Sequence, residues 1–171
     1  MTNFLRSDIV HVMVVLCILS RLADIGTTYL VSPTLKLEAN VIVRRFRWKF
    51  GWLTVLAGLI PYWSMTVGVI VTVASFFVAS SNAGKILMAK ALGEEETAQL
   101  FRRIILAAPP VLGWFYLFLP ALLFSIPGFI IILFLPDPNE WGYWFGDAIV
   151  TYAVIVAFWS AVRYYRIRTA G

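Results

Sequence analysis

Residues 9–31 read IVHVMVVLCILSRLADIGTTYLV, and this stretch decides the fold. Its uninterrupted apolar part ends at Ser20, which is too early, because a helix that crosses a bilayer needs roughly 20 residues. The helix must therefore continue through Arg21 and Asp24 to Val31. At about 1.5 Å per residue, Asp24 then lies on the order of 10 Å inside the membrane from the Val31 end. An ionisable side chain at that depth marks a candidate functional site, and a charged or hydrogen-bonding partner is expected beside it.

The composition of the whole chain is that of a membrane protein. Of its 171 residues, 61% are hydrophobic and 13% are charged, whereas soluble domains average about 45–50% apolar and ~25% charged residues. Residues 50–84 and 104–136 contain no Asp, Glu, Lys or Arg, and each exceeds the minimum of about 18 residues for a spanning helix. We therefore expect one all-α polytopic membrane domain over residues 1–171.

Four hydrophobic segments are expected to form a helical bundle, at about residues 9–31, 52–81, 104–135 and 143–163. Ser32-Pro33 ends the first segment, because a residue that precedes proline disfavours helical geometry. We expect Asn82-Ala83-Gly84 to end the second. Prolines inside the two long charge-free segments predict kinked or re-entrant backbone, which is tolerated in a membrane only where protein covers it. These prolines are Pro61, Pro109, Pro110, Pro120 and Pro127.

Two more polar segments are expected to be helical outside the spans. Residues 38–50 are basic and amphipathic, as is typical of a helix at the membrane interface. Gly93 precedes three consecutive glutamates, which indicates a helix start with acidic residues in its first turn.

The basic residues leave two topologies open. With four simple spans and a cytoplasmic N-terminus, residues 36–49 would place a group of Lys and Arg outside. If residues 52–81 instead form a hairpin that enters the membrane and returns, the N-terminus is outside. Every Lys and Arg is then cytoplasmic except Arg6 and the intramembrane Arg21. The second topology obeys the positive-inside rule better, but it requires irregular backbone at depth. Both topologies predict a cytoplasmic C-terminus.

A cluster of polar side chains is expected around Asp24. The residues three before it and four after it share its helix face, and polar residues beyond Ser32-Pro33 can fold back towards it if the chain turns there. The candidate intramembrane site is therefore Arg21, Asp24, Thr27, Thr28, Glu38 and Asn40. Contacts to lipid headgroups are expected from the basic residues that follow, Arg44, Arg45, Arg47 and Lys49.

Three roles are open for this cluster. In a structural role, Arg21 neutralises Asp24, the threonines bond the backbone, and Glu38 and Asn40 cap the next helix, so that hydrogen bonds hold helices together in lipid. In a binding role, the cluster takes a cation or a polar headgroup. In a catalytic role, Asp24 and Glu38 share a proton or a metal ion. The single histidine, His11, is remote from them, so we expect no zinc site, no metal and no cofactor.

The segments Arg21-Leu-Ala-Asp24-Ile-Gly-Thr27-Thr28 and Leu37-Glu38-Ala39-Asn40 resemble the motifs of an uncharacterised family of small bacterial and archaeal membrane proteins. In that family an Asp…Thr motif ends one helix and Glu-x-Asn-Pro opens the next segment; Val41 stands here in place of the proline. The resemblance covers roughly residues 21–52. It implies a protein of the bacterial cytoplasmic membrane with a shared polar site, and it implies no reaction.

These patterns favour a membrane protein without catalysis, which acts as a subunit or as a binding or scaffold module. Its partners would be membrane lipids and other membrane proteins or a second copy of the chain. One alternative is a carrier for a lipid or an ion, or an intramembrane enzyme, that uses Asp24 and Glu38. Another is a membrane-shaping protein, because the two charge-free stretches could form wedge-like hairpins. The net charge of +5 matches basic residues that face anionic lipid, so no nucleic-acid partner is expected.

Overall fold

The computed structural model describes residues 2–38 and 40–169, and within this part of the chain it contains helices and turns but no strand. The all-α prediction is thereby confirmed. Four helices are long and apolar enough to cross a membrane, at Asp8–Val31, Met65–Leu92, Pro110–Phe134 and Trp141–Thr169. The complete order is α1 (Thr2–Val31), α2 (Val41–Leu53), the 3-10 helix η1 (Thr54–Tyr62), α3 (Met65–Leu92), α4 (Glu94–Ala107), α5 (Pro110–Phe134) and α6 (Trp141–Thr169).

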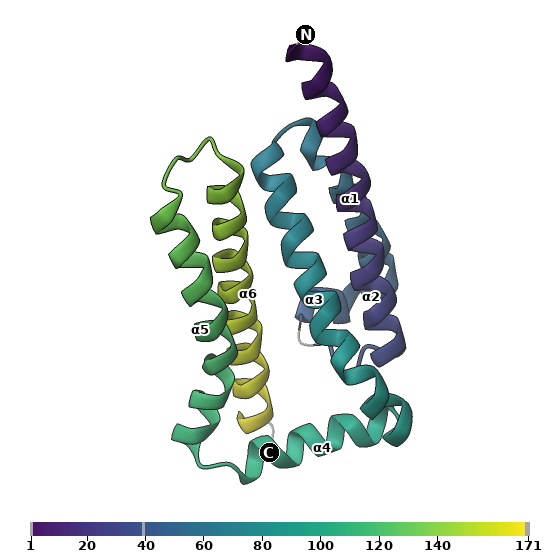
Figure 1. Ribbon diagram of the computed structural model, residues 1–171. Helices are drawn as coiled ribbons and strands as arrows, with labels where there is room; N and C mark the ends of the chain where they lie inside the picture. The colour runs from purple at the N-terminus through teal and green to yellow at the C-terminus, as the bar shows by residue number, and fades with distance from the viewer. Residues whose placement is uncertain (1, 39, 170–171) are drawn as a thin grey trace.

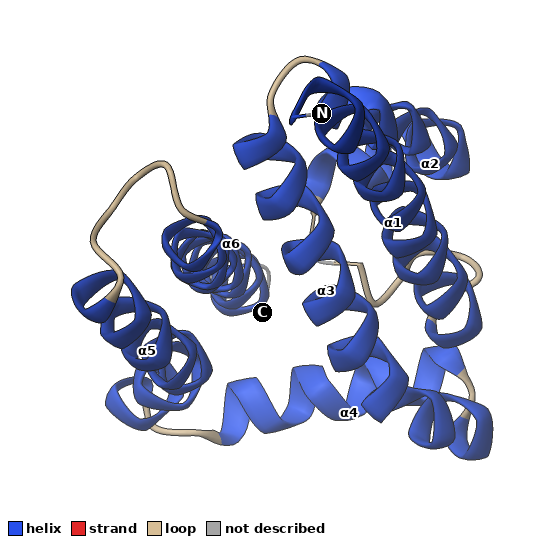
Figure 2. Cartoon of the chain, turned by 45° about the horizontal axis from the view of Figure 1, so that its top comes forward, coloured by secondary structure: helices blue, strands red, loops and turns tan. Residues whose placement is uncertain are grey.

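The long helices run between two ends of an elongated bundle (Figure 1). The start of α1 marks one end, which we call the N-terminal end. At the other, which we call the α4 end, α4 lies across the bundle and α6 finishes. Figure 2 shows α4 joining the α1–α3 side to the α5–α6 pair. The first and last helices therefore start and finish at opposite ends of the molecule.

The chain returns along α1 through α2 and η1. His11 packs edge-on against Tyr62 with ring centroids 5.7 Å apart, whereas Tyr29 packs against Trp48 with centroids 5.4 Å apart. Since a later position on α1 meets an earlier position on the return segment, the two run antiparallel. The return ends at Trp63, and α3 then runs back towards the α4 end (Figure 1). The chain therefore forms a hairpin from the return segment and α3, with its turn at Trp63.

The limits predicted for the second segment are wrong. The charge-free stretch contains η1, a turn at Trp63 and the first part of α3, which Ser64 caps by accepting a hydrogen bond from the Val67 N–H at 3.4 Å. The break expected at Asn82-Ala83-Gly84 does not occur, because α3 continues to Leu92. Asn82 instead donates from Nδ2 to Thr28 Oγ1 of α1 at 2.9 Å. Asn82, whose local propensity favours a turn, thus forms a contact between α3 and α1.

The third predicted segment is also divided differently. It begins inside α4, breaks at Pro109, and continues as α5 from Pro110. Proline is tolerated at the first position of a helix because its missing N–H would have no intrahelical partner there. Pro120 and Pro127 lie within α5 without ending it. The fourth segment is confirmed as α6, which extends beyond residues 143–163 on both sides.

The segment expected to be amphipathic near residues 38–50 forms α2, and the helix expected after Gly93 forms α4. Asn40 caps α2, because its Oδ1 accepts hydrogen bonds from the N–H groups of Ile42 and Val43 at 2.9 and 3.4 Å. The helix is not straight, since Arg47 has φ 55° and ψ −152°. A non-glycine residue in this region is strained, so the surrounding contacts must hold the kink in place.

Close backbone approach at Gly58 allows η1 to lie against α1. A Cβ atom added to Gly58 would lie 2.3 Å from Ile18 Cγ1 and 3.2 Å from Ile18 Cα. Because the Ile18 backbone is also closer than an ordinary van der Waals contact, rotation of the Ile18 side chain alone does not remove the crowding. Gly84 of α3 is different, since an added Cβ would meet no atom within 4 Å.

We predict that Gly58→Ala destabilises the protein by about 1–3 kcal/mol, because η1 must move away from α1. The measurement is the thermal unfolding midpoint of the purified protein in detergent. Gly84→Ala is the matched control, and it should be neutral or stabilising by up to about 1 kcal/mol, since alanine is the better helix former. Equal midpoints for both variants would contradict the close approach.

Candidate functional site

Arg21 is the centre of the polar cluster and joins three elements. Its Nη1 donates to Asp24 Oδ2 at 2.8 Å and to Ser75 Oγ of α3 at 3.1 Å. Its Nη2 donates to Thr54 Oγ1 of η1 at 2.6 Å. The remaining Nε is buried without a hydrogen-bond partner among the described residues. The arginine predicted to neutralise Asp24 therefore also connects α1 to η1 and α3.

Asp24 is bonded through both of its carboxylate oxygens. Oδ2 accepts from Arg21, and Oδ1 accepts from Thr28 Oγ1 at 3.4 Å. Thr28 in turn accepts the hydrogen bond from Asn82 of α3. Thr27 lies beside this chain but bonds its own helix, donating to the carbonyl oxygens of Ala23 and Asp24 at 2.8 and 3.1 Å. Of the two threonines, only Thr28 links helices.

Glu38 and Asn40 organise the start of α2. Asn40 provides the cap already described, and its own N–H donates to Glu38 Oε1 at 2.7 Å. Glu38 lies near enough to Asp24 for their negative charges to repel, but no hydrogen bond joins the two carboxylates in the described part of the chain. The expected fold-back towards Asp24 therefore occurs, and it does not create a proton-sharing pair.

A small cavity of about 30 Å³ lies beside this cluster, close to α4. Its wall includes Glu38 and Thr28 from the predicted site. It also includes Asn82 and Lys85 of α3 and Arg163 of α6. From the sequence, Asn82 is expected to break a helix, and Lys85 and Arg163 are expected to be charges that flank the spans. No spacing rule connects α3 with α6 over such a separation, so only the packing of the helices brings these side chains together.

Glu94, the first residue of α4, anchors the loop that follows α1. Its carboxylate accepts hydrogen bonds from the Thr34 N–H at 3.0 Å, the Thr34 hydroxyl at 2.9 Å and the Lys36 N–H at 2.9 Å. The Ser32 hydroxyl also donates to it. Burial opposes ionisation, but the donors from Ser32, Lys36 and Thr34 hold the pKa of Glu94 below its ordinary value. The three consecutive glutamates predict the helix start, but no local pattern indicates that Glu94 anchors a loop about 60 residues earlier in the chain.

The basic residues expected at lipid headgroups lie on α2. Arg44, Arg45, Arg47 and Lys49 are all exposed. Among the described side chains, no carboxylate forms a salt bridge with any of them. Their positions are compatible with contact to anionic headgroups at the α4 end of the bundle.

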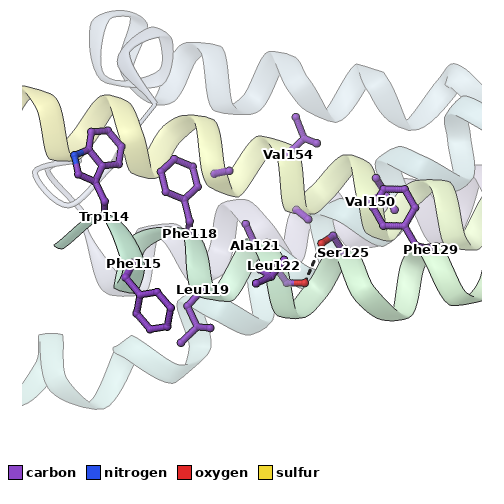
Figure 3. Close-up of a pocket in the computed structure, with 12 residues that line it drawn as sticks. Trp114, Phe115, Phe118, Leu119, Ala121, Leu122, Ser125, Phe129, Val150 and Val154 are labelled. Carbon is purple, nitrogen blue, oxygen red and sulfur yellow. Dashed lines mark hydrogen bonds between the residues drawn. The ribbon is translucent and has the colours of Figure 1, made fainter. Parts of the chain in front are cut away.

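An apolar groove of about 550 Å³ runs between α5 and α6 on the surface of the bundle (Figure 3). Aromatic side chains including Trp114, Phe115 and Phe118 line one part of it, and Ala121 and Val154 lie further along. Ser125, its polar lining residue, donates its hydroxyl hydrogen to the Leu122 carbonyl oxygen at 2.9 Å. The groove therefore presents a nearly pure hydrocarbon surface.

Residues 2–38 and 40–169 contain no group of three or more His, Cys, Asp or Glu side chains arranged to hold a metal ion. Comparison of the chain with family models, with curated proteins and with solved structures finds no match.

We predict that Glu94→Gln destabilises the protein by about 1–3 kcal/mol, because an amide offers one acceptor oxygen where the carboxylate offers two charged ones. Since the pKa of Glu94 is lowered by folding, its contribution is complete above its ordinary pKa of 4.5 and is lost as the pH falls through the lower value of the folded protein. Thermal unfolding in detergent between neutral and acidic pH should show this loss in the wild type.

The matched control is Glu96→Gln in the same first turn. Glu96 is exposed, and the described residues give it no hydrogen bond or ion pair. It shares the favourable position near the helix N-terminus, so the comparison isolates the loop anchor. If the two variants unfold at the same temperature at neutral pH, Glu94 does not anchor the loop.

Proposed function

We propose that the protein is a non-catalytic integral membrane module whose polar cluster is an internal scaffold, and which associates laterally with lipids and with other membrane proteins or itself. One observation carries the scaffold role. Arg21 bonds Asp24, Thr54 and Ser75, so the ion pair within α1 is also the joint with η1 and α3. The donors Arg21 and Thr28 also engage both oxygens of Asp24, which supports a structural use of this acid over transport or proton transfer.

The surface supports the lateral association. The α5–α6 groove is apolar, and half of its lining residues are exposed, including Leu122 and Phe129. The four candidate spans make up more than half of the chain, which supports contacts made within the membrane plane. The wedge-like alternative is less favoured, because the η1–α3 hairpin packs against α1 through Gly58 and Arg21 instead of facing lipid alone.

The distribution of charge supports an orientation in a bacterial cytoplasmic membrane. Apart from Arg6 and Arg21, every Lys and Arg belongs to segments at or near the α4 end (Figure 1). The positive-inside rule then places the α4 end and the C-terminus in the cytoplasm, and the N-terminus outside. The similarity to the small bacterial and archaeal family, carried by the motif from Arg21 to Asn40, agrees with this location.

The scaffold role predicts a specific rescue. Arg21→Met alone should lower stability by about 3 kcal/mol or more, because it leaves Asp24 charged and unpaired inside the membrane. The double variant Arg21→Met, Asp24→Leu should recover much of this loss, because both charges are gone. Thermal unfolding in detergent and folded yield measure both effects. If the Arg21→Met variant is as stable as the wild type, the scaffold role of Arg21 is contradicted.

The same double variant separates a scaffold from a carrier or an enzyme that uses Asp24. A strain that lacks the protein should be complemented by the double variant as well as by the wild type, once their abundance in the membrane is matched. Failure of complementation by a folded, equally abundant double variant would show that the charges at Arg21 and Asp24 act chemically. Glu38→Gln serves as the parallel test of the second carboxylate.

The orientation is tested by labelling single cysteines in intact cells with a membrane-impermeant maleimide. Cys17 has no exposed surface, so its background reaction should be low. A cysteine at Trp63, which is 79% exposed in the η1–α3 turn, should react from outside. A cysteine at Arg45 of α2 should react only after the cells are opened. External labelling at Arg45 would overturn the proposed orientation.

A further inference from the structure

Two cations from different helices face the same small cavity at the α4 end. Lys85 of α3 and Arg163 of α6 both line it, with Phe101 of α4 forming another part of the wall. The cavity is partly open and has a volume of about 30 Å³, which is enough for about one water molecule. Its contact with α4 places it at the end of the bundle that α4 crosses (Figure 1).

Positive charge exceeds negative charge around this cavity. Lys85 and Arg163 repel each other, and Glu38 is the carboxylate whose charge acts on both. Arg44 adds further repulsion at Arg163. Among the described residues, no carboxylate lies within salt-bridge distance of either cation. Such an arrangement in a partly buried position is unfavourable unless an anion compensates it.

Each of the two cationic side chains has one restraining contact. The guanidinium carbon of Arg163 lies 5.0 Å from the centroid of the Phe101 ring, a cation–π contact that restrains the arginine. Lys85 Nζ donates to Ser81 Oγ at 3.3 Å and keeps further hydrogens available. An arginine supplies paired donors to a phosphate and a lysine supplies a point charge. The two together match a tetrahedral anion better than they match a neutral ligand.

We propose that Lys85 and Arg163 bind the phosphate of an anionic ligand at the mouth of this cavity, supplied by a phospholipid headgroup or by free phosphate. Because the cavity is too small to enclose a whole phosphate, one or two oxygens point inwards while the rest of the group stays outside. Its position at the α4 end favours the headgroup as the source. The site does not depend on the scaffold role of Arg21 and Asp24, which lie outside its lining.

The test uses the full chain purified in a non-ionic detergent. Binding of dioctanoyl phosphatidylglycerol is compared with binding of dioctanoyl glycerol, which lacks the phosphate, by native mass spectrometry and by thermal stabilisation. The wild type should bind the first lipid and not the second. Lys85→Gln and Arg163→Gln should each weaken binding by about tenfold or more. Glu38→Gln should strengthen it, because the competing carboxylate is removed while the acceptor for Asn40 is kept.

Lys90→Gln and Arg166→Gln are the matched controls, since each removes an exposed charge from α3 or α6 away from the cavity. They should change binding by less than about twofold. Equal losses in all four charge variants would mean diffuse attraction and would overturn the proposal. If Arg163→Gln does not fold, Lys85→Gln and the gain in Glu38→Gln decide the result.

Inorganic phosphate distinguishes the two sources. One outcome is that millimolar phosphate displaces phosphatidylglycerol from the wild type but not from Lys85→Gln. That result would support a site that recognises the phosphate alone. Binding of the lipid without such competition would support a headgroup site that also needs the acyl chains nearby. Failure of both phosphatidylglycerol and inorganic phosphate to bind the folded wild type would overturn the proposal.

Discussion

A guanidinium inside an apolar helix must find its hydrogen-bond acceptors within the protein, because hydrocarbon offers none. For Arg21, the charged acceptor is the carboxylate of Asp24, one turn along α1. Thr54 and Ser75 provide two further acceptors. Since these two residues belong to η1 and α3, the arginine can make both of these hydrogen bonds only when both segments lie against α1. The same requirement explains why an irregular 3-10 helix is tolerated beside α1. Its α1-facing side is covered by protein, with Gly58 and Pro61 buried, and Gly58 lets it approach closely.

The return of the chain through α2 and η1 has a consequence for the whole bundle. It places the beginning of α1 and the finish of α6 at opposite ends, and it gathers the basic segments at the α4 end (Figure 1). The α4 end is also held together by polar contacts, with Glu94 bonded to Ser32, Thr34 and Lys36. Hydrogen bonds within the apolar region and at its boundary thus fix the relative positions of α1, α3 and α4.

Asp24 and the Lys85–Arg163 cavity are contrasting ways to place charge near a membrane. Asp24 is bonded through both oxygens to Arg21 and Thr28, which favours a structural role. Lys85 and Arg163 repel each other and form no ion pair with a carboxylate among the described residues, which favours a ligand from outside. The charges of Arg21 and Asp24 already compensate each other, whereas two cations that repel each other beside one cavity gain from an anion. The deepest acid is therefore the weaker candidate for chemistry, and the interfacial cations are the stronger one.

The sequence by itself determined the class of fold, because composition and the long charge-free stretches report how much apolar surface must meet lipid. It also determined the Arg21–Asp24 pair and the Asn40 cap, since both are local contacts set by helix spacing. Only the tertiary structure decided that η1 lies on α1, that Asn82 continues α3 and bonds Thr28, and that Lys85 meets Arg163. These contacts join segments that are far apart along the chain. Helical periodicity identifies which residues share a face, but it does not specify which face of another helix they will meet.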